Sequence, residues 1–244
     1  MQIVPVLDLM GGQVVRGIAG RRDEYKPNQS CLVEGSEPLA TARAFRERFG
    51  LTRVYVADLD AIAEAQPDFE TIGELVESGF QISVDCGSVS LQTAERLRQF
   101  AVEEIIVPLE TLADWKALEQ LLEVIPTTSL RFSLDLMNSD PMGVLGENNT
   151  TLEIVDRVSG FGLTKYIVLD LAAVGMNGGL QTLGVCQSIL ERNPQAKIWT
   201  GGGIRNWEEI EELQNACDID GLLVASALHD GQISPAEVKR LSKT

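Results

Sequence analysis

Short apolar runs and longer amphipathic stretches alternate along the whole chain. The runs are rich in Val, Ile and Leu, which is typical of strands buried on both faces, and the stretches between them place apolar residues at the spacing of a helix. This alternation predicts repeated βα units around a parallel sheet. The eight predicted strands are residues 2–7, 53–58, 81–85, 104–108, 130–135, 165–170, 197–201 and 219–225. Amphipathic helices opened by Ser, Thr, Asp or Asn near the first turn are predicted at residues 40–49, 69–78, 91–100 and 207–216.

The strand-end motifs of the first four units recur in the same order in the last four. The matching segments are 6–10 with 133–137, 55–59 with 167–171, 82–87 with 198–203, and 105–107 with 222–224. Two repeated halves of four strands are typical of a barrel and not of a doubly wound open sheet. We therefore predict an α/β fold, a (βα)8 TIM barrel built from two half-barrel repeats. One domain would span residues 1–244, with half-barrels at about 1–125 and 126–244.

Length and charge agree with this fold and exclude some partners. A chain of 244 residues has the usual size of an eight-fold barrel, and 44% hydrophobic residues suffice for a large core. The formal net charge of −16 repels nucleic acids and anionic membranes, so neither is an expected partner. No run of 18 apolar residues and no charged segment before the first strand is present, and we expect a cytoplasmic protein.

Metal and cofactor sites lack their usual motifs. The single histidine, His229, is expected at the surface or at a helix end, since a histidine-rich metal site or a Ser-His-Asp triad has no complete set of residues. Neither G-x-G-x-x-G spacing nor a Walker sequence occurs, so we predict no cofactor and no metal. Widely spaced cysteines without a Cys-x-x-Cys pair are expected to be buried, reduced thiols. They are Cys31, Cys86, Cys186 and Cys217.

Aspartates close the first strand of each half. Asp8 and Asp135 occupy equivalent positions, so they would face each other across the mouth of the barrel, where one can act as an acid and the other as a base. Alternatively, strand-end aspartates cap the loop that follows them. Asp58 and Asp170 form a second symmetric pair, which either orients a substrate hydroxyl and tunes the first pair or is structural. Asp170 is our third catalytic candidate.

A glycine loop near the seventh strand is the most specific segment of the chain. Residues 201–209 contain strand, glycines and helix start in succession, and Asn206 is a plausible cap. Glycines let backbone N–H groups approach an anion, and loops seven and eight are the usual phosphate site of this fold. A glycine turn made only for tight packing is the alternative. The predicted phosphate site comprises Gly202, Gly203, Arg205, Ala225 and Ser226.

The first loop, residues 11–39, is long and carries several cations in an acidic protein. Loops of this length in a compact domain are often lids or binding loops. The cations are Arg16, Arg21, Arg22 and Lys26. We predict that Arg16 and Arg21 contact a phosphorylated small-molecule substrate; alternatively, the loop is a solvated excursion whose cations pair with surface carboxylates.

Four segments occur in the order of one family and cover nearly the whole chain. They are residues 4–16, 54–59, 133–135 and 201–205. Together they resemble the histidine-biosynthesis pair of phosphoribosylformimino-aminoimidazole-carboxamide ribotide isomerase and its cyclase relative. The isomerase is the nearer of the two, partly because its pattern also begins with Pro-x-x-Asp-Leu. The resemblance implies a cofactor-independent Amadori rearrangement of an aminoaldose phosphate, with Asp8 and Asp135 as the acid and base and a second-half phosphate site at Gly202, Gly203, Ala225 and Ser226.

The chain departs from this family at three strand ends. After the third strand, Asp85 stands where a second glycine-rich phosphate loop is usual. Residues 169–176 lack the family's Thr and its Arg-Asp-Gly-Thr run, and residues 107–110 replace a small glycine-rich turn. Residues 19–27 also look like a divergent branch from organisms with tetrahydromethanopterin-linked one-carbon chemistry. Two alternatives to the isomerase therefore stay open: a paralogue in that cofactor's biosynthesis, and a non-catalytic barrel that binds a phosphorylated metabolite. The oligomeric state stays open as well.

Overall fold

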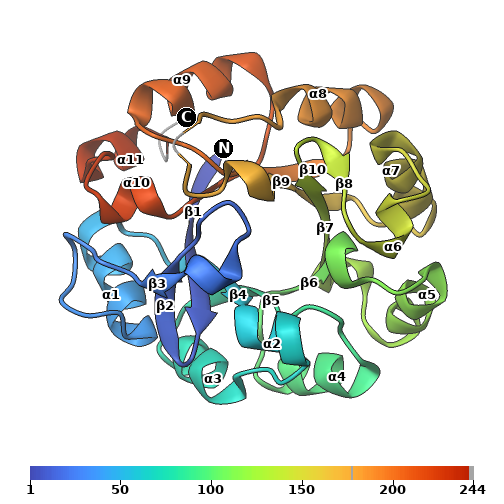
Figure 1. Cartoon of the computed structure of the whole chain (residues 1–244), viewed down its shortest axis with the longest axis horizontal. Helices are drawn as coiled ribbons and strands as arrows, with labels where there is room; N and C mark the ends of the chain where they lie inside the picture. Colours follow the sequence, from blue (N-terminus) through green and yellow to red (C-terminus); the bar gives the residue numbers. More distant parts are fainter. Residues whose placement is uncertain (177, 242–244) are drawn as a thin grey trace.

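A closed ring of parallel strands forms the centre of the molecule. The computed structural model describes residues 1–176 and 178–241, and within them eight parallel strands close through the pairing of the first strand with the last (Figure 1). These strands are β1 (Gln2–Met10), β4 (Arg53–Asp58), β5 (Gln81–Asp85), β6 (Glu104–Pro108), β7 (Leu130–Met137), β9 (Lys165–Asp170), β10 (Lys197–Gly201) and β11 (Gly221–Val224). The predicted (βα)8 barrel is confirmed, and each predicted strand is present with its ends shifted by at most three residues.

Helices surround the ring and connect its strands (Figure 1). They are α1 (Pro38–Phe49), α2 (Leu59–Glu64), α3 (Phe69–Glu77), α4 (Leu91–Gln99), α5 (Trp115–Val124), α6 (Gly143–Gly146), α7 (Thr151–Gly160), α8 (Leu183–Arg192), α9 (Trp207–Ala216), α10 (Ser226–His229) and α11 (Pro235–Leu241). Polar side chains cap several first turns as predicted, because they accept backbone N–H groups that have no partner inside the helix. Ser90 caps α4 and Asn206 caps α9. All four predicted helices are confirmed.

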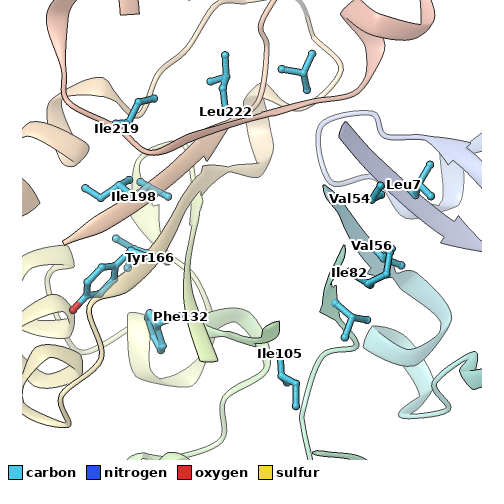
Figure 2. Close-up of a cluster of buried hydrophobic side chains, with 14 of the residues drawn as sticks. Leu7, Val54, Val56, Ile82, Ile105, Phe132, Tyr166, Ile198, Ile219 and Leu222 are labelled. Carbon is cyan, nitrogen blue, oxygen red and sulfur yellow. The ribbon is translucent and has the colours of Figure 1, made fainter. Parts of the chain in front are cut away.

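The main hydrophobic core lies between the strands and the helices. Figure 2 shows its strand residues, among them Leu7, Val56, Ile105 and Phe132, pointing away from the centre of the ring. Because side chains alternate along a strand, the intervening residues point into the barrel. There Trp199 packs with Tyr55, Ile106 and Leu223 in a second, smaller core. The apolar runs of the sequence thus serve two cores at once.

The barrel interior is filled in the middle and polar at both ends. Trp199 belongs to the inner core, and Gly221 on the adjacent strand makes room for it, because a Cβ there would lie 2.4 Å from the Trp199 ring. Glu104 and Arg131 lie inside at the N-terminal ends of β6 and β7. Asp8 and Asp135 point inward near the C-terminal ends of their strands. The strand alternation therefore separates the polar residues into two groups with a packed layer between them.

The two half-barrels carry matching hairpins. β1 continues into an antiparallel pair with β2 (Gln13–Arg16), and β7 into one with β8 (Asp140–Pro141). Their two-residue turns, at Gly11–Gly12 and at Asn138–Ser139, have positive φ at both positions, as tight hairpin turns of this type require. The predicted half-barrel repeat is therefore present in three dimensions, and it lengthens β1 and β7 beyond their predicted ends.

Two expectations about single residues are corrected. Cys31 is exposed, whereas Cys86, Cys186 and Cys217 are buried as predicted. His229 ends the short helix α10, but it is buried against Phe45 rather than at the surface. Burial lowers the pKa of His229 to about 4, so the ring is neutral at physiological pH. Across the described residues, no helix is both long and apolar enough to span a bilayer.

Candidate active site

A cavity opens at the C-terminal ends of the barrel strands. It contains about 1020 Å³ of space that protein atoms do not fill, part of which is open solvent at its mouth. Six of the predicted site residues line it: Asp8, Asp135, Gly202, Gly203, Ala225 and Ser226. The structure therefore brings the predicted acid–base pair and the predicted glycine loop to one place.

Asp135 is a buried carboxyl group held by two donors. The Ser133 hydroxyl donates to Oδ1 at 2.6 Å, and the Glu110 backbone N–H donates to Oδ2 at 3.1 Å. Burial raises the pKa of Asp135 to about 8, with Asp85 adding to the rise by like-charge repulsion. At neutral pH this side chain is therefore mainly the protonated acid, able to donate a proton into the cavity.

Asp8 lies under the loop that follows the first strand. A Cβ on Gly17 of that loop would lie 3.2 Å from Asp8 Oδ2, so the loop backbone passes directly over the carboxyl group. Burial raises the pKa of Asp8 to about 7, while the positive charge of Arg22 limits the rise. Asp8 is thus poised to exchange a proton near neutral pH, which suits a general base.

Two further carboxyl groups in the cavity were not among the predicted site residues. Asp85 accepts hydrogen bonds from the Tyr55 hydroxyl at 3.1 Å and from the Gly87 backbone N–H at 2.9 Å. Burial raises the pKa of Asp85 to about 6 and that of Tyr55 well above its usual value. Glu110 follows β6 in a short 3-10 helix, Leu109–Thr111. The signal that could have found Asp85 was its position at a strand end, the property by which Asp8 was chosen.

The first loop partly covers the cavity and brings a cation into it. Its 3-10 turn Arg22–Glu24 places Arg22 Nη2 2.9 and 3.0 Å from the two carboxylate oxygens of Glu110. Arg22 and Tyr25 line the cavity, whereas Arg16 and Arg21, the predicted ligand contacts, do not. The loop was expected to contact a ligand, and the residues that reach the cavity are Gly17, Gly20, Arg22 and Tyr25.

The loop after β9 meets the first loop across the mouth. The backbone N–H of Ala19 donates to the Val174 carbonyl at 2.8 Å. A Cβ on Gly175 would lie 2.0 Å from the carbonyl oxygen of Gly17, so glycine is required for this close approach. The two loops therefore form a continuous backbone bridge that shields part of the cavity from solvent.

The side of the cavity at the ends of β10 and β11 is formed by small residues and backbone. Gly202 and Gly203 have φ values of +89° and +84°, a conformation in which a side chain would be strained. A Cβ on Gly203 would also lie 2.7 Å from the Gly179 carbonyl oxygen. Ala225 and Ser226 line the same side at the start of α10. Here the backbone is accessible to a ligand because no bulky side chain covers it.

Four predicted site residues lie outside this lining. Arg16 forms an ion pair with Asp230 at 2.5 Å, Arg21 lies near Glu24 on the surface, and Arg205 pairs with Glu209. Each of these cations thus has a carboxylate partner. For Arg16 and Arg21 this agrees with the alternative that the first loop is a solvated segment whose cations pair with surface carboxylates. Asp170 accepts hydrogen bonds from the backbone N–H groups of residues 138, 139 and 172, so it holds the β7–β8 turn and favours the structural alternative.

Its counterpart in the first half, Asp58, is engaged in a similar way. Asp58 accepts backbone N–H groups of Ala61 and Asp68 at 3.0 and 2.7 Å, and burial raises its pKa. The second symmetric pair of aspartates therefore organises loops in both half-barrels. In the described residues, no three His, Cys, Asp or Glu side chains are grouped as ligands for a metal ion.

The fold and the cavity together define a (βα)8 barrel whose mouth contains two carboxyl groups, Asp8 on β1 and Asp135 on β7, and a glycine loop after β10. The chain belongs to the family described as histidine biosynthesis protein, whose model matches residues 2–234.

Sequence similarity to known proteins extends over nearly the full length of this chain. An uncharacterized protein of Methanocaldococcus jannaschii is 31% identical over 242 residues, covering 98% of this chain and 97% of that protein. Two proteins named 1-(5-phosphoribosyl)-5-((5-phosphoribosylamino)methylideneamino)imidazole-4-carboxamide isomerase match at lower identity. The one from Cenarchaeum symbiosum is 27% identical over 250 residues (96% of this chain, 97% of the relative), and the one from Bacillus cytotoxicus is 26% identical over 250 residues (100% of both).

Proposed function

We propose that this protein is a cofactor-independent isomerase that converts a phosphorylated aminoaldose into an aminoketose by an Amadori-type rearrangement. The observation that carries the proposal is the cavity shared by Asp8, Asp135 and the glycine loop at Gly202 and Gly203. An acid, a base and an anion site in one cavity are the groups that this reaction requires. Relatives named as isomerases of a phosphoribosylamino compound support the same assignment.

The two aspartates take different roles because their environments differ. Asp135, with a pKa of about 8, gives its proton to the ring oxygen of the sugar; the C1–O bond breaks and the amino nitrogen lone pair forms a C1=N iminium bond. Asp8, nearer ionisation because of Arg22, then removes the C2 proton, and the electron pair of that bond forms the enaminol. Proton transfer from Asp8 to C1 and from the enol oxygen to Asp135 yields the ketose and restores both carboxyl groups.

The phosphate would bind where the backbone is accessible, at Gly202, Gly203, Ala225 and Ser226. Backbone N–H groups in glycine loops suit an anion, and they hold the substrate without placing a second positive charge near the reacting carbons. The bridge between the first loop and the loop after β9 would exclude water while the imine, which water can hydrolyse, is present.

Replacement of Asp8 tests the catalytic assignment. In Asp8→Asn we expect turnover to fall by about 10³-fold, within the range typical for loss of a general base, whereas inorganic phosphate should bind within about twofold of the wild type. The assay uses the compound in the relatives' name together with singly phosphorylated aminoaldoses, and calorimetry measures phosphate binding. Asp60→Asn is the matched control, since Asp60 is an exposed carboxylate that accepts the Gly11 N–H of the β1–β2 turn. Unchanged turnover in Asp8→Asn would rule out the assigned role.

A non-catalytic phosphometabolite-binding barrel is the second candidate. The segment after β9 favours it, because Leu171–Ala173 offers no hydroxyl group to the cavity and Asp170 is engaged by backbone donors. Phosphate binding without turnover of any aminoaldose tested would support this candidate. It would also direct attention to a paralogue in one-carbon cofactor biosynthesis, whose substrate differs from that of the named relatives.

A further inference from the structure

The two halves of the barrel present equivalent loops to one cavity, but the loops differ in chemistry. When residues 82–87 are laid over 198–203, Asp85 takes the position of Gly201 and Cys86 that of Gly202. In the next unit, Leu109 takes the position of Ser226, and its side chain is fully buried. The second half therefore offers backbone to a ligand, whereas the first half offers the Asp85 carboxylate, and Leu109 is packed in the main core.

The charged side chains of the cavity are unevenly distributed around the ring of strands. In the described lining of the cavity, the acidic side chains are Asp8, Asp85, Glu110 and Asp135, and the basic one is Arg22. None of the acidic ones comes from the last three strands or their loops. The carboxylates of Asp85 and Glu110 repel a second phosphate, so a ligand that binds by one phosphate at the glycine loop meets negative charge at its other end.

The cavity already holds one organic cation at this end. The Arg22 guanidinium lies against both oxygens of Glu110, and its charge also acts on Asp8 and Asp85. Asp85, by contrast, has the neutral donors Tyr55 and Gly87 as its hydrogen-bond partners. One guanidinium thus faces several carboxyl groups, and the carboxylate of Asp85 is left with capacity for a positively charged donor.

We propose that the ligand of this cavity carries a single phosphate and, at its far end, a protonated amine that binds beside Asp85 and Glu110. This inference rests on the proposed phosphate site and narrows its substrate class from phosphorylated aminosugars in general to monophosphates with a basic nitrogen. The amine supplies the missing positive charge, and its N–H groups match the free lone pairs of the two carboxylates. The Amadori chemistry keeps its place between the two ends, at Asp8 and Asp135.

A matched series of linear probes tests the far end of the ligand without imposing sugar stereochemistry. Alkyl monophosphates of three to six carbons are compared with a terminal amine, a terminal hydroxyl or a second phosphate, using calorimetry at pH 7.5. At the best length we expect the amine to bind at least about tenfold more tightly than the hydroxyl probe, which corresponds to one charge-assisted hydrogen bond. The bisphosphate should bind more weakly than both.

Substitutions then test whether Asp85 and Glu110 cause the tighter binding of the amine probe. In Asp85→Asn the amine's advantage should fall to within about twofold while the hydroxyl probe keeps its affinity, and Glu110→Gln should reduce the advantage independently. Glu103→Gln is the matched control, since Glu103 is a partly exposed carboxylate that pairs with Arg53 at the other end of the barrel, and removing it changes the net charge equally. Glu110→Gln also keeps the test valid if Asp85→Asn folds poorly.

The outcomes separate this inference from the proposed function. Equal binding of amine and hydroxyl probes, or tighter binding of the bisphosphate, would overturn the inference while leaving the phosphate site intact. If inorganic phosphate and all three probes fail to bind, the proposed phosphate site fails and the inference fails with it. An amine preference that survives in both Asp85→Asn and Glu110→Gln would also overturn it.

Discussion

Buried acidic side chains lie at both ends of the barrel interior, and their pKa values are shifted in opposite directions. At the N-terminal end, Glu104 contacts Arg131 Nε at 2.8 Å and Lys165 Nζ at 2.7 Å. Burial alone would raise the pKa of Glu104, but the hydrogen bonds and charges of these two cations more than offset it, so the pKa is lowered. At the C-terminal end, burial raises the pKa values of Asp8, Asp85 and Asp135 to between about 6 and about 8.

The difference supports the proposed location of the active site at the C-terminal ends of the strands. Arg131 also donates to the carbonyls of Tyr166 and Lys197 and stacks 3.8 Å from the Trp199 ring, so the N-terminal group is satisfied within the protein. The C-terminal carboxyl groups are held by hydroxyl and backbone donors and share one guanidinium. Unpaired buried carboxyl groups cost stability, and a cavity is where such a cost accompanies function.

The largest effect on stability is expected from removing Arg131, which pairs with Glu104 at the N-terminal end of the barrel. Arg131→Met leaves Glu104 buried with Lys165 as its remaining cation and removes two hydrogen bonds to carbonyls. We expect a loss of about 3–5 kcal/mol in the free energy of unfolding, the usual cost of removing one partner from a buried ion pair. Urea unfolding at pH 7.5 measures it. Arg131→Met combined with Glu104→Gln should recover part of the loss, and a loss below about 1 kcal/mol in the single variant would contradict the structural role.

A smaller effect, an increase in stability, is expected from replacing Asp135 at the C-terminal end of the barrel. Because the pKa of Asp135 is raised from 3.8 to about 8 on folding, the folded state binds more protons than the unfolded state between these values, and stability falls as the pH rises through this window. Asp135→Asn removes this dependence, since its amide can donate to Ser133 and accept from the Glu110 N–H. We expect the variant to be more stable than the wild type by about 1–3 kcal/mol at pH 9.

Urea unfolding of both proteins at pH 5, 7 and 9 checks this expectation. The difference between the two proteins should be smallest at pH 5 and grow toward pH 8, because the unfolded wild type ionises Asp135 above about pH 3.8 whereas the folded wild type keeps it protonated up to about pH 8. The lowered pKa of His229 makes both proteins lose stability as the pH falls from about 6.5 toward 4, and this contribution cancels in the comparison. A stability difference that is independent of pH would show that Asp135 is ionised in the folded state.

The smallest effect is expected from removing the guanidinium group of Arg22, which lies among the carboxyl groups at the C-terminal end. Arg22→Gln removes the positive charge that lowers the pKa values of Asp8 and Asp85, so both should rise, by roughly half a unit to one unit. The acidic limb of the pH–rate profile should shift upward by the same amount, while stability changes by less than about 1 kcal/mol because the pair with Glu110 is partly exposed. Arg21→Gln, one residue earlier and on the surface, should leave the profile unchanged; equal shifts in both variants would refute the assignment.

Much of the barrel could be read from the sequence because its signals are local and repeated. The apolar runs match all the strands of the ring, and the doubled Leu-Asp-Leu-Met motif indicated both the half-barrel repeat and the place of Asp8 and Asp135. The errors came from long-range contacts. Cys31 and His229 were misplaced because the exposure of a single side chain depends on elements distant in sequence, here the first loop and α10.

The residues of the candidate site also divide into those that local sequence predicts and those that depend on long-range contacts. By itself, the sequence determined the strands, the strand-end aspartates and the glycine loop, because alternation along a strand and φ values that require glycine are properties of a few consecutive residues. Only the tertiary structure decided that Arg22 rather than Arg16 or Arg21 enters the cavity, that Asp85 and Glu110 line it together with Asp8 and Asp135, and that Asp170 organises a turn. Those assignments depend on how a long loop folds back over the barrel and on which charges burial leaves without a partner, and neither is encoded within a short window of sequence.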